Sequence, residues 1–231
     1  MFYLDPLYLV LAIPGLLLGL WAQMRVKGTF NKYANVRTTR NLTGAEVARY
    51  LLDNQGLQDV RIEQVQGMLS DHYDPRARVL RLSPAVYGTP SVSAAGVAAH
   101  ETGHAIQHSV GYGPLQIRSA IVPVVQFSSS LAPILIIIGL LLRFTTLAWI
   151  GVIFFAAAVV FSLITLPVEF DASRRAKALL DQGGLMSSDE LKGVDKVLDA
   201  AGWTYVAAAV AAVGQLLYYV LLLTGGGRRR S

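Results

Sequence analysis

The chain lacks cysteine and carries little charge. Its 231 residues include no Cys, and only 15% of them are Asp, Glu, Lys or Arg. The absence of cysteine excludes disulfides and thiolate metal ligands and fits a reducing compartment, so a metal site would have to use histidine and carboxylate. Histidine is also scarce, with four in the chain, whereas hydrophobic residues make up 53%. This composition favours a small folded domain attached to membrane spans over a single soluble domain.

Four apolar runs approach the length of about 20 residues that crosses a bilayer. They cover residues 6–24, about 119–142, 146–166 and 202–223. The sequence therefore predicts a mainly α-helical membrane protein with about four transmembrane helices. No Lys or Arg precedes the first run and no small-residue cleavage site follows it, so we expect a retained anchor rather than a cleaved signal peptide.

The net charge of +5 is explained by where the basic residues lie relative to the predicted spans. It gives no reason to expect nucleic-acid binding. Sixteen of the twenty Lys and Arg residues fall in 25–118 and 167–201. Four crossings place these two segments on the same side of the membrane, and the positive-inside rule then predicts that both face the cytosol. The basic tail at Arg228 to Arg230 argues for the opposite orientation.

Between the spans, the sequence predicts a small α+β domain. Thr43 and Glu46 have capping-box spacing at the start of one helix, and Ser91 or Ser93 caps a second helix that runs through residue 108. The stretches 59–67 and 78–83 are predicted as two strands joined by the turn-like "DHYDPRA". The expected order is an anchor at 1–24, an α+β catalytic domain at 25–117, a transmembrane hairpin at 118–166, a helical segment from Pro167 to 201 and a transmembrane helix with basic tail at 202–231.

Two of the four histidines share a predicted helix in the stretch "HETGH" at 100–104. Residues i and i+4 lie on one helix face, so His100 and His104 can converge on one zinc ion at about 2.0–2.1 Å from each nitrogen. Glu101 lies about 100° around the helix, where it can act as general base towards a metal-bound water. Gly103 costs the helix about 1 kcal/mol, so we expect another segment to pack closely there. The alternative is a helix with ordinary surface histidines.

A catalytic zinc needs a third protein ligand. His108 is too far away, because eight helical residues advance about 12 Å, so it is expected to have a supporting role near the helix end. The other candidates on the predicted cytosolic face are His72, with its neighbours Asp71 and Asp74, and Glu169 with Asp171. Glu169 follows an apolar run directly, but a carboxylate there could equally complement a helix dipole. The spacing leaves Glu169, Asp171 and His72 open.

The stretches "LSDHYDPRARVLRLSPAVYGTPSVSAAGVAAHETGHAIQH" and "LPVEFDASRRA" resemble the YugP-type membrane zinc metallopeptidases of bacteria, and more distantly the HtpX-type and CaaX-prenyl-protease-type enzymes. The resemblance runs from about residue 41 to 202. It implies a zincin-like, gluzincin-type domain with Zn²⁺ held by His100, His104 and Glu169, and Glu101 as general base. HtpX-like relatives place an Asp four residues after the ligand Glu to orient a ligand histidine. Ser173 stands there in this chain, leaving Asp171, or no carboxylate, for that role.

The resemblance further implies an endopeptidase of the bacterial inner membrane. The charge distribution places its active site on the cytoplasmic side, and this location leads us to expect membrane-associated or misfolded polypeptides as substrates. The expected oxyanion donor is one of His72, Tyr73, Arg174 and Arg175, and the strand at 78–83 is expected to pair with an extended substrate. A homo-oligomer and a regulatory membrane partner both stay open.

Two other functions are weighed against this one. A site-2-type intramembrane protease would use Asp199 as a ligand, but Lys192, Asp195 and Lys196 make that segment polar. A catalytically inactive membrane scaffold or adaptor would keep a structural metal or none. The apolar cores of the four spans hold no ionisable residue, which argues against transport but leaves a scaffold open.

Overall fold

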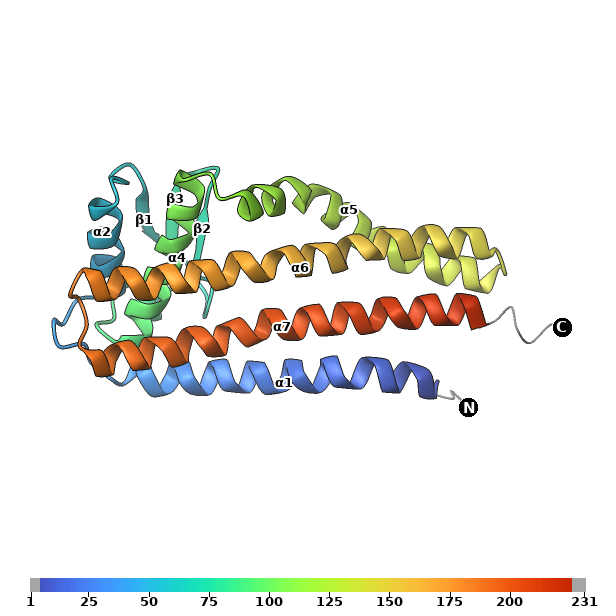
Figure 1. Ribbon diagram of the computed structural model, residues 1–231, viewed down its shortest axis with the longest axis horizontal. Coiled ribbons are helices and arrows are strands. Elements are labelled where there is room, and N and C mark those ends of the chain that lie inside the picture. The colour runs from blue at the N-terminus through green and yellow to red at the C-terminus, as the bar shows by residue number, and fades with distance from the viewer. Residues whose placement is uncertain (1–4, 226–231) are drawn as a thin grey trace. The chain divides into compact units, whose positions relative to one another are not determined.

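The computed structural model describes residues 5–225, and the chain is mainly helical (Figure 1). Its elements are α1 (Pro6–Ala34), α2 (Gly44–Asn54), β1 (Arg61–Gln64), β2 (His72–Asp74), β3 (Val79–Leu82), α3 (Pro84–Tyr87), α4 (Val92–Ser109), α5 (Gly113–Leu141), α6 (Thr145–Gln182) and α7 (Ser188–Gly225). By length and composition, α1, α5, α6 and α7 could each cross a membrane. The predicted mainly helical chain with four candidate spans is confirmed. The basic tail at Arg228 to Arg230 lies outside the described residues.

The chain divides into two compact units. The spanning unit comprises Met1–Ala22, Ile117–Leu166 and Thr204–Ser231, and the site unit comprises Gln23–Gln116 and Pro167–Trp203. Within the spanning unit, small residues let helix backbones approach closely. A Cβ on Gly15 of α1 would lie 2.6 Å from the Cα of Ala211 in α7, and one on Gly139 of α5 would lie 2.5 Å from the backbone nitrogen of Ala148 in α6.

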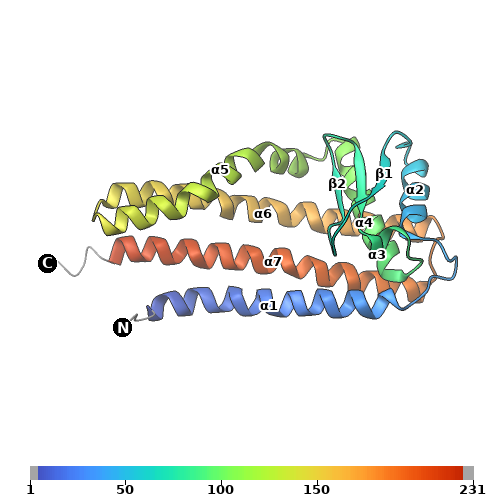
Figure 2. The same ribbon diagram turned by 180° about the vertical axis from the view of Figure 1, so that it is seen from behind.

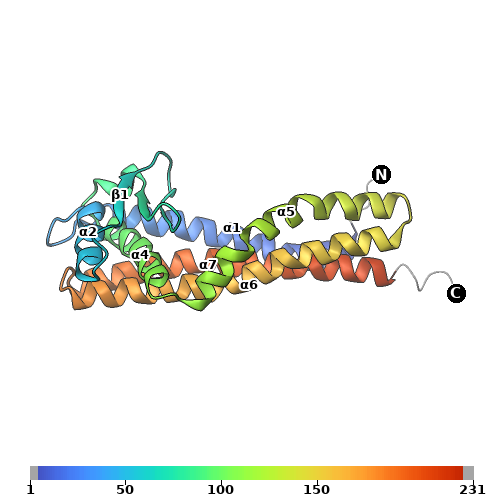
Figure 3. The same cartoon turned by 90° about the horizontal axis from the view of Figure 1, so that it is seen from above.

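Two helices of the site unit begin at the caps that the sequence predicts. Thr43 and Glu46 form both hydrogen bonds of a capping box at the start of α2. Ser91 is the N-cap of α4, and its hydroxyl accepts a hydrogen bond from the Ala94 backbone N–H. Figure 3 shows α2 beside α4. The histidine-bearing helix is thus fixed at its N-terminus by its own sequence.

The sheet differs from the prediction of two strands joined by a turn. It has three strands in the order β1-β3-β2, with β1 parallel and β2 antiparallel to β3. The extra strand, β2, lies within the stretch predicted as a turn (Figure 2). The tight turn begins only at Asp74, whose side chain accepts hydrogen bonds from the Arg76 and Ala77 backbone N–H groups. The residues before Asp74 therefore stay extended and pair with β3.

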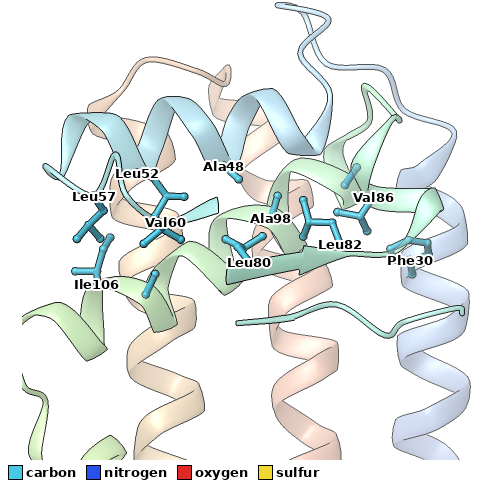
Figure 4. Packing of buried hydrophobic residues seen from close by; sticks show 12 residues of the cluster. Phe30, Ala48, Leu52, Leu57, Val60, Leu80, Leu82, Val86, Ala98 and Ile106 are labelled. Carbon is cyan, nitrogen blue, oxygen red and sulfur yellow. The ribbon is translucent and has the colours of Figure 1, made fainter. Parts of the chain in front are cut away.

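Two buried clusters hold the site unit together. In the first, Leu80 and Leu82 of β3 pack with Leu52 of α2 and with Ala98 and Ile106 of α4 (Figure 4). The second cluster joins α2 and α4 to the parts of α6 and α7 that belong to this unit; it contains Val47, Leu51, Val92, Ala95, Ala99, Ala176, Leu180, Val194 and Leu198. Helix α4 therefore packs against the sheet on one side and against α6 on another.

The predicted helical segment at 167–201 does not start a new helix at Pro167. Helix α6 runs through Pro167 without a break, and α7 likewise continues past residue 201. Proline removes one backbone donor from a helix interior, but buried packing of Val168, Ala172 and Ala176 on the following turns holds α6 in helical form. Helix α6 ends before Gly183–Gly184, where Gly184 has a φ of +56°, and α7 begins at Ser188.

Candidate metal centre

Helices α4 and α6 bring two histidines and one carboxylate together. The ring centroids of His100 and His104 lie 4.8 Å apart. Glu169 Oε2 lies 3.2 Å from His100 Nε2 and 3.5 Å from His104 Nε2. One ligand atom from each of the three residues falls within 4.8 Å of the others, close enough to share one ion. The side chains are 12%, 11% and 3% exposed, so the group is nearly closed to solvent.

The close approach of the two helices depends on Gly103. A Cβ at this position would lie 2.7 Å from the carbonyl oxygen of Ala172 in α6. The expectation that another segment packs tightly against this turn is confirmed, and Ala172 identifies that segment. Because Gly103 stands next to His104 and Ala172 stands three residues after Glu169, this contact sets the spacing between the histidines and the carboxylate.

Each histidine has a partner on its other ring nitrogen. His100 Nδ1 lies 3.1 Å from the Ser173 hydroxyl, and His104 Nδ1 lies 3.0 Å from Gln107 Oε1. Ser173 thus occupies the place where the HtpX-like pattern has an aspartate, and a hydroxyl contacts the histidine there. Asp171 does not contact either histidine directly; it accepts a hydrogen bond from Gln107 Nε2 at 2.9 Å.

The charges of the group are complementary. Burial alone raises the pKa of the Glu169 carboxyl, but hydrogen bonds to His100 and His104 outweigh burial and hold that pKa far below its ordinary range. Burial lowers the pKa of His104, and the hydrogen bond to Glu169 followed by the charge of Glu101 more than reverses this and raises it. Glu101 is itself buried, on the helix turn that carries both histidines. The site therefore concentrates two carboxylates against two imidazoles, a set that suits a divalent cation.

The other ligand candidates lie outside this group among the described residues. His72 is exposed, and its Nδ1 lies 2.8 Å from the Ser70 carbonyl. Asp71 accepts hydrogen bonds from the Ser83 backbone N–H and hydroxyl, and Asp74 is occupied by its turn and by Arg81. Of the three ligand alternatives left open by spacing, only Glu169 joins the histidines.

Four further residues with expected roles have other partners. His108 Nδ1 lies 2.9 Å from the Tyr73 hydroxyl of β2, which agrees with the expectation that this histidine is not a ligand. Arg174 and Arg175 both pair with Asp171, and the guanidinium of Arg175 lies over the Tyr112 ring. Asp199, required by the site-2-type alternative, forms an ion pair with Arg25 at 2.6 Å.

Sequence reasoning missed Gln107. This side chain is fully buried and donates to the Val168 carbonyl at 2.8 Å as well as to Asp171. One signal was available: Gln107 follows His104 by three residues, so the two share a helix face. The Val168 and Asp171 contacts come from a segment more than 60 residues away, and no local pattern indicates them.

Comparisons with known proteins agree with this centre. Residues 8–224 match the family described as "Putative neutral zinc metallopeptidase". The chain is 51% identical over 210 residues to "Putative membrane protease YugP" of Bacillus subtilis (strain 168), covering 91% of this chain and 93% of that protein. No solved structure matches. With the match extending over nearly the whole chain and both histidines and Glu169 meeting in one buried group, the chain belongs to this zinc metallopeptidase family and is of the YugP type.

Proposed function

We propose that the chain is a membrane-embedded, zinc-dependent endopeptidase in which His100, His104 and Glu169 hold the metal and Glu101 is the general base. The observation that carries this proposal is the buried group of two histidines and one glutamate on a His-Glu-x-x-His helix. Two imidazoles and one carboxylate are a ligand set of catalytic zinc, which leaves a fourth position for water or substrate. Both histidines keep slight solvent exposure, at 12% and 11%.

Zinc, when bound, supplies a Lewis acid that polarises the scissile carbonyl and lowers the pKa of water. Glu101 then accepts a proton from the attacking water as the C–O bond forms, and delivers it to the amine nitrogen as the C–N bond breaks. Burial beside the histidines suits this role, since water-free surroundings strengthen the interaction of Glu101 with developing charge. Glu169 would hold the metal together with the two histidines and would take no part in proton transfer.

Among the four candidates, we propose Tyr73 as the oxyanion donor. Burial raises the pKa of its hydroxyl, so Tyr73 remains protonated at neutral pH and can donate a hydrogen bond. The hydroxyl is held by His108, which lies seven residues after Glu101 and therefore on nearly the same face of α4. Arg174 and Arg175 are engaged by Asp171, and His72 lies exposed.

The expected edge pairing of substrate with the strand at 78–83 is wrong. This stretch contains β3, which is the central strand and is hydrogen-bonded on both sides. The edge strand next to α4 is β2, which also carries Tyr73. We place an extended polypeptide substrate along β2, because an edge strand offers free backbone donors and acceptors. This arrangement of a sheet edge over the histidine helix is the zincin-like element of the proposal.

The proposed setting is the bacterial inner membrane, with the site facing the cytoplasm. Support comes from the four candidate spans and from the Lys and Arg residues concentrated in 25–118 and 167–201. Polypeptides that are membrane-associated or misfolded would reach such a site most readily.

The test is Glu101→Gln in the full-length protein purified in detergent, with Glu63→Gln on β1 as the matched control. We expect Glu101→Gln to keep stoichiometric zinc while hydrolysis of casein falls by about 10²–10⁴-fold. The control should match wild type in both measurements. Wild-type protein that binds zinc but cleaves no unfolded or membrane-associated polypeptide would instead support a scaffold with a structural metal.

A further inference from the structure

Gln107 sits between the two helices of the metal centre and is oriented entirely by α6. The side chain is 0% exposed. Its Nε2 donates to the Val168 carbonyl at 2.8 Å and to Asp171 Oδ2 at 2.9 Å. Both partners can only accept, since Asp171 is kept as a carboxylate by ion pairs with Arg174 and Arg175. The amide nitrogen must therefore face α6, and Oε1 must face His104.

This orientation decides which nitrogen of His104 carries hydrogen. Gln107 Oε1 is an acceptor 3.0 Å from His104 Nδ1, so Nδ1 must donate. Without metal, Nε2 also carries a hydrogen towards Glu169 Oε2 at 3.5 Å; once that proton leaves, the hydrogen on Nδ1 ensures that the Nε2 lone pair is the one offered to a metal. Turning the amide over would bring oxygen against oxygen at both α6 contacts. Two unfavourable contacts in a buried site exclude that arrangement.

From these contacts we propose that Gln107 is a positioning residue. The acceptors on Asp171 and Val168 fix the orientation of its amide, and the amide oxygen then accepts from His104 Nδ1 and holds the Nε2 lone pair towards the metal. This inference rests on the proposed function, because it presumes that His104 ligates zinc. It assigns Asp171 an indirect role: the carboxylate orients an amide, and the amide orients the histidine. Neutral Gln107 thereby takes the place that a carboxylate holds beside many zinc-bound histidines.

The tautomers of the two histidines are fixed to different degrees. The Ser173 hydroxyl at His100 Nδ1 can either donate or accept, so it does not dictate a tautomer. Only His104 has a partner of fixed polarity. Loss of the Gln107 amide should therefore lower zinc affinity more than loss of the Ser173 hydroxyl.

The experiment measures zinc Kd by competition with a chromophoric chelator, together with the Tm of the metal-free protein, on full-length protein in detergent. Gln107→Met keeps the size of the side chain but removes the amide, and we expect a weakening of zinc binding of about 10–100-fold. Ser173→Ala should weaken it less. Thr102→Val is the matched control, because Thr102 is also buried on α4 but donates only to Ala98 of its own helix. Its zinc Kd should stay within about threefold of wild type, since its hydroxyl touches no ligand.

A polarity swap separates positioning from packing. Gln107→Glu alone places two carboxylates together and should weaken zinc binding. Adding Asp171→Asn supplies an amide that can donate to the new carboxylate, so the double variant should bind zinc at least tenfold more tightly than Gln107→Glu. The positioning role is overturned if Gln107→Met has the wild-type zinc Kd, whether or not its metal-free Tm falls. It is also overturned if the double variant binds zinc no more tightly than Gln107→Glu. If the wild-type protein binds no zinc, or if His100→Ala binds zinc as well as the wild type does, the proposed function itself is overturned.

Discussion

Replacing Gly103 by alanine tests whether the contact between α4 and α6 sets the metal site. The new Cβ would lie 2.7 Å from the Ala172 carbonyl oxygen, whereas ordinary van der Waals contact begins at 3.4 Å. The helices must separate by up to about 0.7 Å, since both contacting groups belong to helix backbones. Zinc sites tolerate only about 0.2 Å in their ligand distances. We therefore expect zinc affinity to fall by about tenfold or more, equivalent to about 1.4 kcal/mol.

The stability of the same variant reflects two opposing effects that partly cancel. Alanine improves helix propensity by about 1 kcal/mol, while overpacking costs about 1–3 kcal/mol. The net loss is up to about 2 kcal/mol, or a Tm decrease of up to about 8 °C in a chain of this size. Gly28→Ala in α1 is the control: it lies in a helix with nothing within 4 Å of the added Cβ, so it should raise Tm and leave zinc Kd unchanged. Wild-type zinc affinity in Gly103→Ala would refute the reasoning.

Three further predictions concern single side chains. Glu169→Gln should weaken zinc binding by more than the roughly 10–100-fold that is typical when a residue hydrogen-bonded to a ligand is lost. Asp199→Asn should leave zinc content unchanged; the reverse result would favour the site-2-type alternative. Tyr73→Phe should keep zinc but reduce kcat by about 10²-fold, as expected for loss of an oxyanion donor, and a wild-type kcat would exclude that role. Burial raises the pKa of Glu190, but hydrogen bonds from the backbone outweigh it and lower that pKa from 4.5. The stabilisation it provides is thus present above pH 4.5 and lost as pH falls through the lower folded value. Glu190→Gln should cost about 1–3 kcal/mol at pH 7, and the Tm difference from wild type should shrink on acidification below pH 4; a difference that is constant with pH would contradict this.

The local features of the chain could be predicted because they depend on neighbours in sequence. The Thr43–Glu46 capping box, the Ser91 cap and the His100–His104 pair each involve residues three or four apart on one helix. The close packing at Gly103 was also foreseeable, because a glycine within a helix is unfavourable unless space demands it. What packs there, Ala172, could not be derived from the spacing.

The missed features depend on contacts between distant segments. The three-residue strand β2 has the sequence His-Tyr-Asp, too short and too polar to show strand periodicity, and it forms because β3 offers an edge. Proline favours the first turn of a helix, so a local pattern predicts a helix start at Pro167, but packing of the turns beyond it keeps α6 continuous. Gln107 looks like any polar helix residue until Val168 and Asp171 are placed beside it.

The proposed ligands stand within helices and not in loops, and this limits where insertions and deletions can be tolerated. One residue inserted between His100 and His104, or between Val168 and Ser173, would turn everything beyond it by about 100° and carry a ligand or its partner off the shared face. Insertions at 110–112 or 142–144, where the chain leaves helix, would leave both helix registers intact. Length differences among active homologues should therefore fall in those connections, and a homologue with an indel inside either helical stretch should have lost its metal.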